Sequence, residues 1–244
     1  MHKRIDRLGR SDTLPSPYAD DPAIVPILTG VDGKNVLCLA GGGGRQAAVF
    51  ALLGAHVTVL DLTPEQLERD RLSARHYGYD VTLIQGDMRD LSDLPSDHFV
   101  RVLQPISTLY VPDLREVYQG VARVLKPGGL YFADYVYPLL KMPEKEDWDG
   151  DSYVLRFREP HVRGKIFERD DVQNFTEGEF FGEFNHLLSD IINGQIAEGL
   201  QIVGTWESPR PGSHRPLSKL APGSSEHRHS ILPLGLSVVS QLVA

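Results

Sequence analysis

The stretch Val36-Leu37-Cys38-Leu39-Ala40-Gly41-Gly42-Gly43-Gly44 decides the fold of this 244-residue chain. A short apolar run that ends in four glycines is typical of a buried parallel strand followed by a tight turn. Residues 45–54 continue with apolar side chains at helical spacing, and Gly54 predicts the end of that helix. The stretch therefore predicts a strand, a glycine turn and a helix in succession.

The alternation of strand and helix continues beyond this turn. Thr63-Pro64 opens a helix that reaches Tyr77, with Thr63 as its cap and proline at its first position. Two more helices are predicted at 111–125 and 189–199, and six more strands at 56–60, 80–85, 99–103, 130–135, 200–207 and within 227–243. Such alternation implies parallel strands joined by right-handed crossovers. The predicted fold class is α/β, a doubly wound, mostly parallel seven-stranded Rossmann-like sheet with helices on both faces.

The chain divides into an arm and a main domain. Residues 1–34 are polar and rich in proline, so we interpret them as an irregular N-terminal arm with a short helix near 23–28. Residues 35–244 form the main domain. Within it, the acidic and proline-broken segment at about 138–185 is predicted to be an insertion or lid, with a short strand at 152–158.

Composition narrows the class of protein. The content of 41% hydrophobic and 24% charged residues is ordinary for a globular protein, and the net charge of −8 disfavours nucleic acid as a partner. The single cysteine suits a reducing compartment. The longest apolar stretch, 231–244, is too short to span a bilayer. We expect a cytoplasmic protein with no nucleic-acid or membrane partner, and the sequence leaves open whether it is a homo-oligomer.

About 20 residues after Gly42, Asp61 ends the next predicted strand. Glycines at a strand-to-helix turn let a ligand approach the backbone, and an acid at the end of the second strand can accept hydrogen bonds from ribose hydroxyls. This pattern predicts a nucleotide-type cofactor without naming it, because Gly42, Gly44 and Ala47 also match the dinucleotide fingerprint. An NAD-dependent oxidoreductase stays open at this point.

Two further motifs follow in order, Gln85-Gly86-Asp87-Met88 and Val124-Leu125-Lys126-Pro127-Gly128-Gly129. Together with the glycine turn and Asp61, they resemble the ordered motif set of class I S-adenosylmethionine-dependent methyltransferases, in particular the ubiquinone-biosynthesis-type branch that acts on small molecules. The resemblance covers residues 35–137 well. It implies S-adenosylmethionine as cofactor, S-adenosylhomocysteine as product, and methyl transfer to an O, N or C atom of a small-molecule acceptor.

The resemblance also implies roles for single residues. The glycine loop would lie against the methionine part of the cofactor, with Arg45 and Gln46 near its carboxylate. Asp61 would hold the ribose hydroxyls, while Asp87 and Met88 would contact the adenine. The full set of expected cofactor-binding residues is Ala40, Gly41, Gly42, Gly44, Arg45, Gln46, Asp61, Leu62, Asp87, Met88 and Gln104.

The chain departs from the family pattern in its first strand. Cys38 stands where the family usually carries an acid that helps to organise the cofactor's amino group, and Ala40 stands where a glycine is usual. The amino group is then left to backbone carbonyls, such as those of Ala40 and Gln104, or to water. We expect Cys38 to be a small buried apolar residue and not a nucleophile. A non-catalytic subunit that binds S-adenosylmethionine therefore stays as a second alternative.

The candidate catalytic residues are Ser107, Tyr110 and His186. The first two follow the fourth predicted strand, in the region that faces the transferable methyl group in the family. A sulfonium is already a potent methyl donor, so alignment of the acceptor can supply much of the acceleration. A general base, for which His186 is the candidate, is needed only if the acceptor loses a proton. No metal site is expected, because His227 and His229 alternate along a predicted strand without partnering acids.

Overall fold

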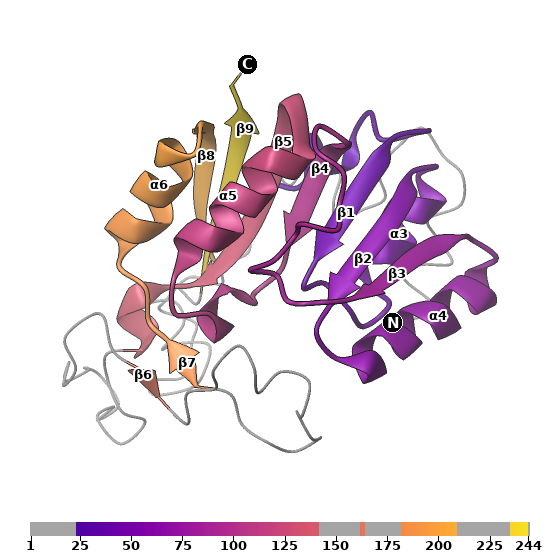
Figure 1. Cartoon of the computed structure of the whole chain (residues 1–244), viewed down its shortest axis with the longest axis horizontal. Coiled ribbons are helices and arrows are strands. Elements are labelled where there is room, and N and C mark those ends of the chain that lie inside the picture. The colour runs from indigo at the N-terminus through magenta and orange to yellow at the C-terminus, as the bar shows by residue number, and fades with distance from the viewer. Residues whose placement is uncertain (1–22, 142–161, 164–181, 209–234, 244) are drawn as a thin grey trace, which may run out of the picture.

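The computed structural model describes residues 23–141, 162–163, 182–208 and 235–243. Its main feature is a seven-stranded sheet in the order β3-β2-β1-β4-β5-β9-β8 (Figure 1). Strands β1 to β5 pair in parallel, and β9 is antiparallel to both of its neighbours, β5 and β8. This confirms the predicted doubly wound, mostly parallel sheet. The strands are β1 Asn35–Leu39, β2 His56–Asp61, β3 Val81–Gln85, β4 Phe99–Gln104, β5 Leu125–Val136, β8 Leu200–Ser208 and β9 Gly235–Leu242.

Helices cover both faces of the sheet. On one face, alternate residues of β1 such as Leu37 and Leu39 join a core cluster with α5 and α6. On the other face, Val36 and Cys38 join a cluster with α2, α3 and α4. Both sets of β1 side chains are buried, which explains why this strand is a continuous apolar run. The helices are α2 Val25–Leu28, α3 Gln46–Leu52, α4 Pro64–Tyr77, α5 Leu114–Val124 and α6 Leu188–Ala197, with 3₁₀ turns η1 Thr108–Tyr110 and η2 Pro138–Lys141.

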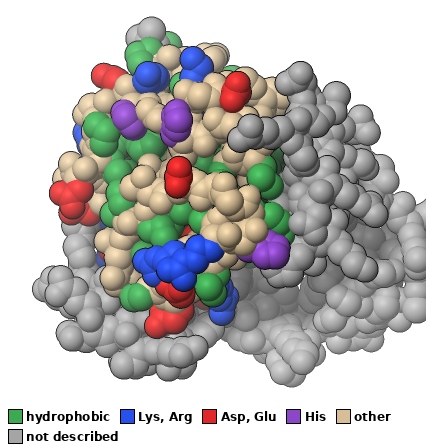
Figure 2. All heavy atoms as spheres, turned by 90° about the vertical axis from the view of Figure 1, so that its right-hand side faces the viewer, with side chains coloured by type: hydrophobic (Ala, Val, Ile, Leu, Met, Phe, Trp, Pro, Cys, Tyr) green, Lys and Arg blue, Asp and Glu red, His purple; other side chains and the backbone are tan. Residues whose placement is uncertain are grey.

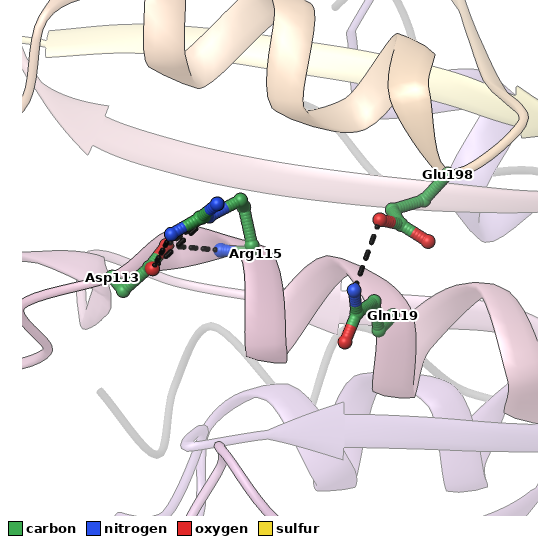
Figure 3. Close-up of polar contacts among 4 residues, drawn as sticks. All are labelled: Asp113, Arg115, Gln119 and Glu198. Carbon is green, nitrogen blue, oxygen red and sulfur yellow. Dashed lines mark hydrogen bonds and ion pairs between the residues drawn. The ribbon is translucent and has the colours of Figure 1, made fainter.

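Helix α5 is fixed at its start and along one side by polar contacts (Figure 3). Asp113 caps it, since its carboxylate accepts from the backbone amide of Arg115 at 2.9 Å and pairs with the Arg115 guanidinium at 2.6 Å. Gln119 donates to the Glu198 carboxylate just beyond α6 at 3.2 Å. The first contacts fix the start of α5, and the last one joins α5 to the residue that follows α6.

Strand β5 begins earlier than the predicted residue 130. Leu125 already pairs with Phe99, and the next pair joins Leu130 to Arg101. Residues 126–129 therefore lie in an irregularity of the strand, where Gly128 takes a positive φ of 77°. The sequence signal for the end of α5 was correct, but it did not reveal that the strand starts at once.

The described parts of the predicted arm and lid lie on the domain. Helix α2 confirms the short helix, and Ala23, Ile27 and Val31 are buried in the same cluster as β1. From the predicted lid, β6 (Val162–Arg163) and β7 (Glu183–Phe184) form a small antiparallel sheet. The predicted strand at 152–158 and residues 227–234 of the last predicted strand lie outside the described residues. No helix in the described ranges is long and apolar enough to cross a membrane.

Candidate active site

A cavity of ≈ 340 Å³ opens at the carboxyl ends of β1 to β4. The strand order reverses between β1 and β4, and open α/β sheets bind their ligands at such a switch point. The loops after four strands and the small strand β7 contribute its wall. The lining residues are Ala40, Gly42, Asp61, Leu62, Thr63, Gln66, Gly86, Asp87, Met88, Arg89, Ile106, Ser107, Tyr110, Val111, Gly182 and Phe184.

The glycine loop approaches β2 and α4 so closely that it requires glycine. A Cβ at Gly42 would lie 2.6 Å from the Gln66 Cβ and 2.7 Å from the Asp61 Oδ2. Gly43 and Gly44 have φ values of 117° and 75°, a region that side-chain-bearing residues rarely adopt. The glycine run is therefore explained by sterics as well as by any ligand that lies against it.

Asp61, at the end of β2, is buried and holds the loop. Its Oδ2 accepts from the Gly42 amide at 2.8 Å, and its Oδ1 accepts from the amide and hydroxyl of Thr63, both at 3.0 Å. A carboxylate has about four acceptor positions, so roughly one remains for a ligand in the cavity. Asp61 thus shapes the site and also borders it.

A second acid under the loop was missed by the sequence analysis. Asp70 of α4 is fully buried, and its Oδ2 accepts from the Gly43 amide at 2.8 Å. Burial raises the pKa of Asp70 to about 6, although the amides of Gly43 and Gly44 act in the opposite direction. The available signal was its position three residues after Leu67, on the buried stripe of an otherwise polar helix.

Asp87 and Arg89 form an ion pair in the cavity wall. The guanidinium binds both carboxylate oxygens, with Nη2 to Oδ2 at 2.5 Å and Nε to Oδ1 at 3.0 Å, and the Arg89 amide donates to Oδ1 at 2.9 Å. The predicted adenine acceptor is therefore already engaged by Arg89. Sequence reasoning overlooked Arg89, because the conformation of the loop after β3, which brings the two side chains together, is not evident from the sequence.

Below the cavity floor, Gln104 is fixed by three polar contacts. Its Oε1 accepts from the Tyr131 hydroxyl, and its Nε2 donates to the Met88 Sδ and the Ser107 Oγ, both at 3.2 Å. A thioether sulfur can only accept, which fixes the orientation of the amide. Ser107 donates its own proton to the Pro105 carbonyl at 3.0 Å. Ser107 can therefore offer a ligand an acceptor but no donor.

Tyr110 belongs to the turn η1, and His186 contacts the backbone of that turn. Tyr110 borders the cavity, is 44% exposed, and has a pKa raised by partial burial and by the charge of Glu183. The His186 Nε2 lies 3.0 Å from the Thr108 carbonyl, and burial lowers the pKa of the ring. The neutral imidazole thus donates to the backbone of η1, and it does not border the cavity.

The predicted site residues fall into two groups. Eight of them border the cavity, namely Ala40, Gly42, Asp61, Leu62, Asp87, Met88, Ser107 and Tyr110. Of the others, Gly41, Gly44 and Gln104 lie behind the lining, while Arg45 and Gln46 border a separate cavity of ≈ 210 Å³ beside α2. Within the described ranges, no group of three His, Cys, Asp or Glu side chains could hold a metal ion.

The sheet order, the glycine loop and the acid at the end of β2 agree with the class I S-adenosylmethionine-dependent methyltransferases that the sequence resembles. Residues 37–133 match the methyltransferase domain family. The chain is 32% identical over 177 residues to the uncharacterized methyltransferase YbaJ of Bacillus subtilis, covering 72% of this chain and 69% of that protein. The chain belongs to this methyltransferase family, so the NAD-dependent oxidoreductase is set aside.

Two further similarities agree with this assignment. The ubiquinone biosynthesis O-methyltransferase of Erwinia tasmaniensis is 34% identical over 154 residues, which is 61% of each chain. The crystal structure of a protein from Listeria monocytogenes described as an S-adenosylmethionine-dependent methyltransferase superposes with a TM-score of 0.69 at 18% identity, covering 91% of this chain and 96% of that one. The structural similarity supports the fold.

Proposed function

We propose that the cavity holds both S-adenosylmethionine and the methyl acceptor of this enzyme, in two halves. The cofactor half is Ala40, Gly42, Asp61, Leu62, Asp87 and Met88, and the acceptor half is Ile106, Ser107, Tyr110, Val111 and Phe184. The observation that carries the proposal is the convergence of Gly42 and Asp61 at one end of the cavity, joined by a 2.8 Å hydrogen bond.

The residues of the cofactor half fit the parts of S-adenosylmethionine. Asp61 retains an acceptor position for a ribose hydroxyl, and the loop at Gly42 carries no side chain to obstruct the methionine part. Leu62 and Met88 offer apolar contact for an adenine ring, beside the Asp87–Arg89 pair. When bound, the cofactor supplies an electrophilic methyl group on a sulfonium.

The acceptor half supports a small molecule with an apolar face. Ile106 and Tyr110 line the cavity and are 51% and 44% exposed, and Val111 and Phe184 add to the apolar lining. Ser107 offers only an acceptor lone pair, which suits a hydroxyl or amine on the ligand. One relative carries the name of an O-methyltransferase of ubiquinone biosynthesis, which agrees with such an acceptor.

The chain's contribution to the reaction is positioning. Neither Ser107 nor Tyr110 has an ordinary pKa near neutrality, and His186 donates to the backbone of η1. The acceptor half therefore aligns the ligand and excludes water, while the methyl donor provides the reactivity. The predicted lid at 138–185 belongs to this proposal, and it is supported by Gly182 and Phe184, which border the cavity.

The expected partners and location are also part of this proposal. The net charge of −8 supports the absence of a nucleic-acid partner. On the face seen in Figure 2, Lys and Arg side chains lie among acidic ones and form no continuous basic surface in the coloured region. The single cysteine supports a cytoplasmic location.

Calorimetric titration with S-adenosylhomocysteine tests the proposal directly. Asp61→Ala removes a hydrogen-bond acceptor of the ligand and the anchor of the Gly42 amide, so binding should weaken by about 1.5–3 kcal/mol. Asp113→Ala is the matched control, because it removes an acid that caps α5 outside the cavity lining and should leave affinity unchanged. Unchanged affinity in Asp61→Ala, or tight NADH binding by the wild type, would contradict the proposal.

A further inference from the structure

Three consecutive glycines, 42–44, are each held by a different side chain. Asp61 accepts from the first amide and Asp70 from the second, both at 2.8 Å. Ser73 donates to the third carbonyl at 3.1 Å and is itself bonded by the Tyr79 hydroxyl at 3.1 Å. Apart from Asp61, these side chains come from α4 and the residue pair that follows it, and not from the strand that the loop leaves.

Asp70 is an unusual member of this set. Its side chain is fully buried, and its Oδ1 has no hydrogen-bond partner among the described residues. A buried carboxylate oxygen without a partner costs stability, so its retention calls for an explanation. The oxygen that is bonded contacts the loop at Gly43, next to the cavity-lining Gly42.

The position of Asp70 complements the missing acid of β1. Cys38 stands where the family pattern has an acid. A Cβ added at Gly41 would lie 3.2 Å from the Cys38 Cβ, so Cys38 lies directly under the loop. Burial raises the pKa of the Cys38 thiol, and the charge of Asp70 raises it further, so the two side chains lie close enough to interact. Cys38 lies on β1, and Asp70 lies on α4, which packs against β3 and β2.

We propose that Asp70 is a positioning residue that supplies a carboxylate beneath the glycine loop from α4, in a chain whose β1 carries Cys38 in place of an acid. It holds the Gly43 amide so that Gly42 keeps the conformation that meets the cofactor. This inference rests on the proposed cofactor site. It predicts that the carboxylate acts in its ionised form, because an ionised acceptor binds backbone amides more strongly than a neutral one.

Among the described residues, the titratable groups that interact with Asp70 carry no positive charge. They are Asp61 of β2, Cys38 of β1 and Tyr79 beyond α4. With a folded pKa of about 6 against an ordinary value of 3.8, Asp70 contributes stability at low pH that is lost as the pH rises through 6. Cofactor binding should follow the opposite trend, since it needs the ionised carboxylate and weakens below pH 6. A merely structural residue would not separate the two trends.

Asp70→Asn tests the inference, with S-adenosylhomocysteine as the titrant and the partly exposed Glu68→Gln on the same helix as control. At pH 7.5 the Asn variant should bind roughly tenfold or more weakly, with an unfolding midpoint equal to or above that of the wild type. Unlike the wild type, the Asn variant should not bind S-adenosylhomocysteine more weakly as the pH falls below 6. Wild-type affinity in the Asn variant, or parallel losses of affinity and stability, would overturn the inference.

A rescue experiment makes the test independent of any folding defect in one variant. Cys38→Asp, introduced into Asp70→Ala, returns the carboxylate to β1 and should recover most of the affinity lost in Asp70→Ala. Failure to recover affinity in a folded double variant counts against Asp70 as a substitute for the β1 acid. If the wild type itself does not bind S-adenosylhomocysteine, the proposed cofactor site is wrong; if it binds and the Asp70 variants bind equally well, only this inference is wrong.

Discussion

The two halves of the cavity are held in place by different kinds of contact. In the cofactor half, carboxylates grip consecutive backbone amides, as Asp61 does for Gly42. In the acceptor half, neutral groups form a buried chain in which Tyr131 fixes Gln104 and Gln104 fixes Ser107. Hydrogen bonds from backbone amides to carboxylates give a rigid binding surface for a polar cofactor. In the neutral network, residues outside the cavity lining determine which hydrogen-bonding groups the lining offers to a ligand. Changes in the first half should therefore alter cofactor affinity, and changes in the second should alter stability or turnover.

Among substitutions that leave the acidic residues unchanged, Gly42→Ala is expected to have the largest effect on affinity. Its Cβ would lie 2.6 Å from the Gln66 Cβ, so the loop must move away from α4 and lose its bond to Asp61. Binding of S-adenosylhomocysteine should weaken roughly ten- to hundredfold by calorimetry. Gly78→Ala, at the left-handed end of α4 and outside the cavity, should lower stability and leave affinity unchanged. Equal affinities in the two variants would show that the loop is not the cofactor surface.

Tyr131→Phe tests the acceptor half in the same way. It leaves the buried Gln104 Oε1 without its donor, which should lower the free energy of unfolding by about 1–3 kcal/mol in a denaturant titration. Affinity for S-adenosylhomocysteine should fall less than in Gly42→Ala, because Gln104 contacts the cofactor half only through the Met88 sulfur. Tyr118→Phe is the control, since its hydroxyl contacts Tyr135 and not Gln104. A loss of cofactor affinity as large as that of Gly42→Ala would remove the distinction between the halves.

His186→Gln should have a smaller effect on methyl transfer. Because the imidazole donates to Thr108, single-turnover transfer to an identified acceptor should fall only a few-fold. A loss in the general-base range of about 10²–10⁴-fold would instead make His186 the base. Burial lowers the pKa of His186 in the folded state below its ordinary value of 6.5. The wild type should therefore lose stability as the pH falls below 6.5, and the Gln variant should lose less.

The smallest expected effect is on hydrogen exchange at β7. Gly182 and Phe184 border the cavity, so bound S-adenosylhomocysteine should slow exchange in 182–187 and leave α5 unchanged. Exchange in 182–187 that does not respond to the ligand would remove the support for a lid over the acceptor half.

The sequence predicted more of the cavity lining at the ends of β1 and β2 than around η1, for a physical reason. Gly42 and Asp61 lie at the ends of adjacent parallel strands, and such ends always meet at one edge of a sheet. Arg45 and Gln46 were expected at the same edge, but α3 begins there and carries them toward the cavity beside α2. Helical direction at a turn depends on packing, which spacing alone does not reveal.

Other features required long-range contacts that leave little trace in the sequence. The contact between Asp70 and the loop joins residues far apart along the chain, and only a charge on an apolar stripe hinted at it. The fixing of Gln104 by Tyr131 depends on the pairing of β4 with β5, whose register includes an irregularity. Both contacts depend on how neighbouring elements pack in three dimensions.

The position of β9 has a consequence for the order of folding. β9 follows β8 in the chain but lies between β5 and β8, and it is the neighbour through which β8 joins the sheet. In a nascent chain that ends before residue 235, β8 has no neighbouring strand with which to pair. Helix α6 then lacks part of the surface against which it packs. Because β5 and β9 are separated by about a hundred residues, closing this side of the sheet is a slow, long-range step. During synthesis the cavity at the ends of β1 to β4 can therefore form before β9 completes the opposite side of the sheet.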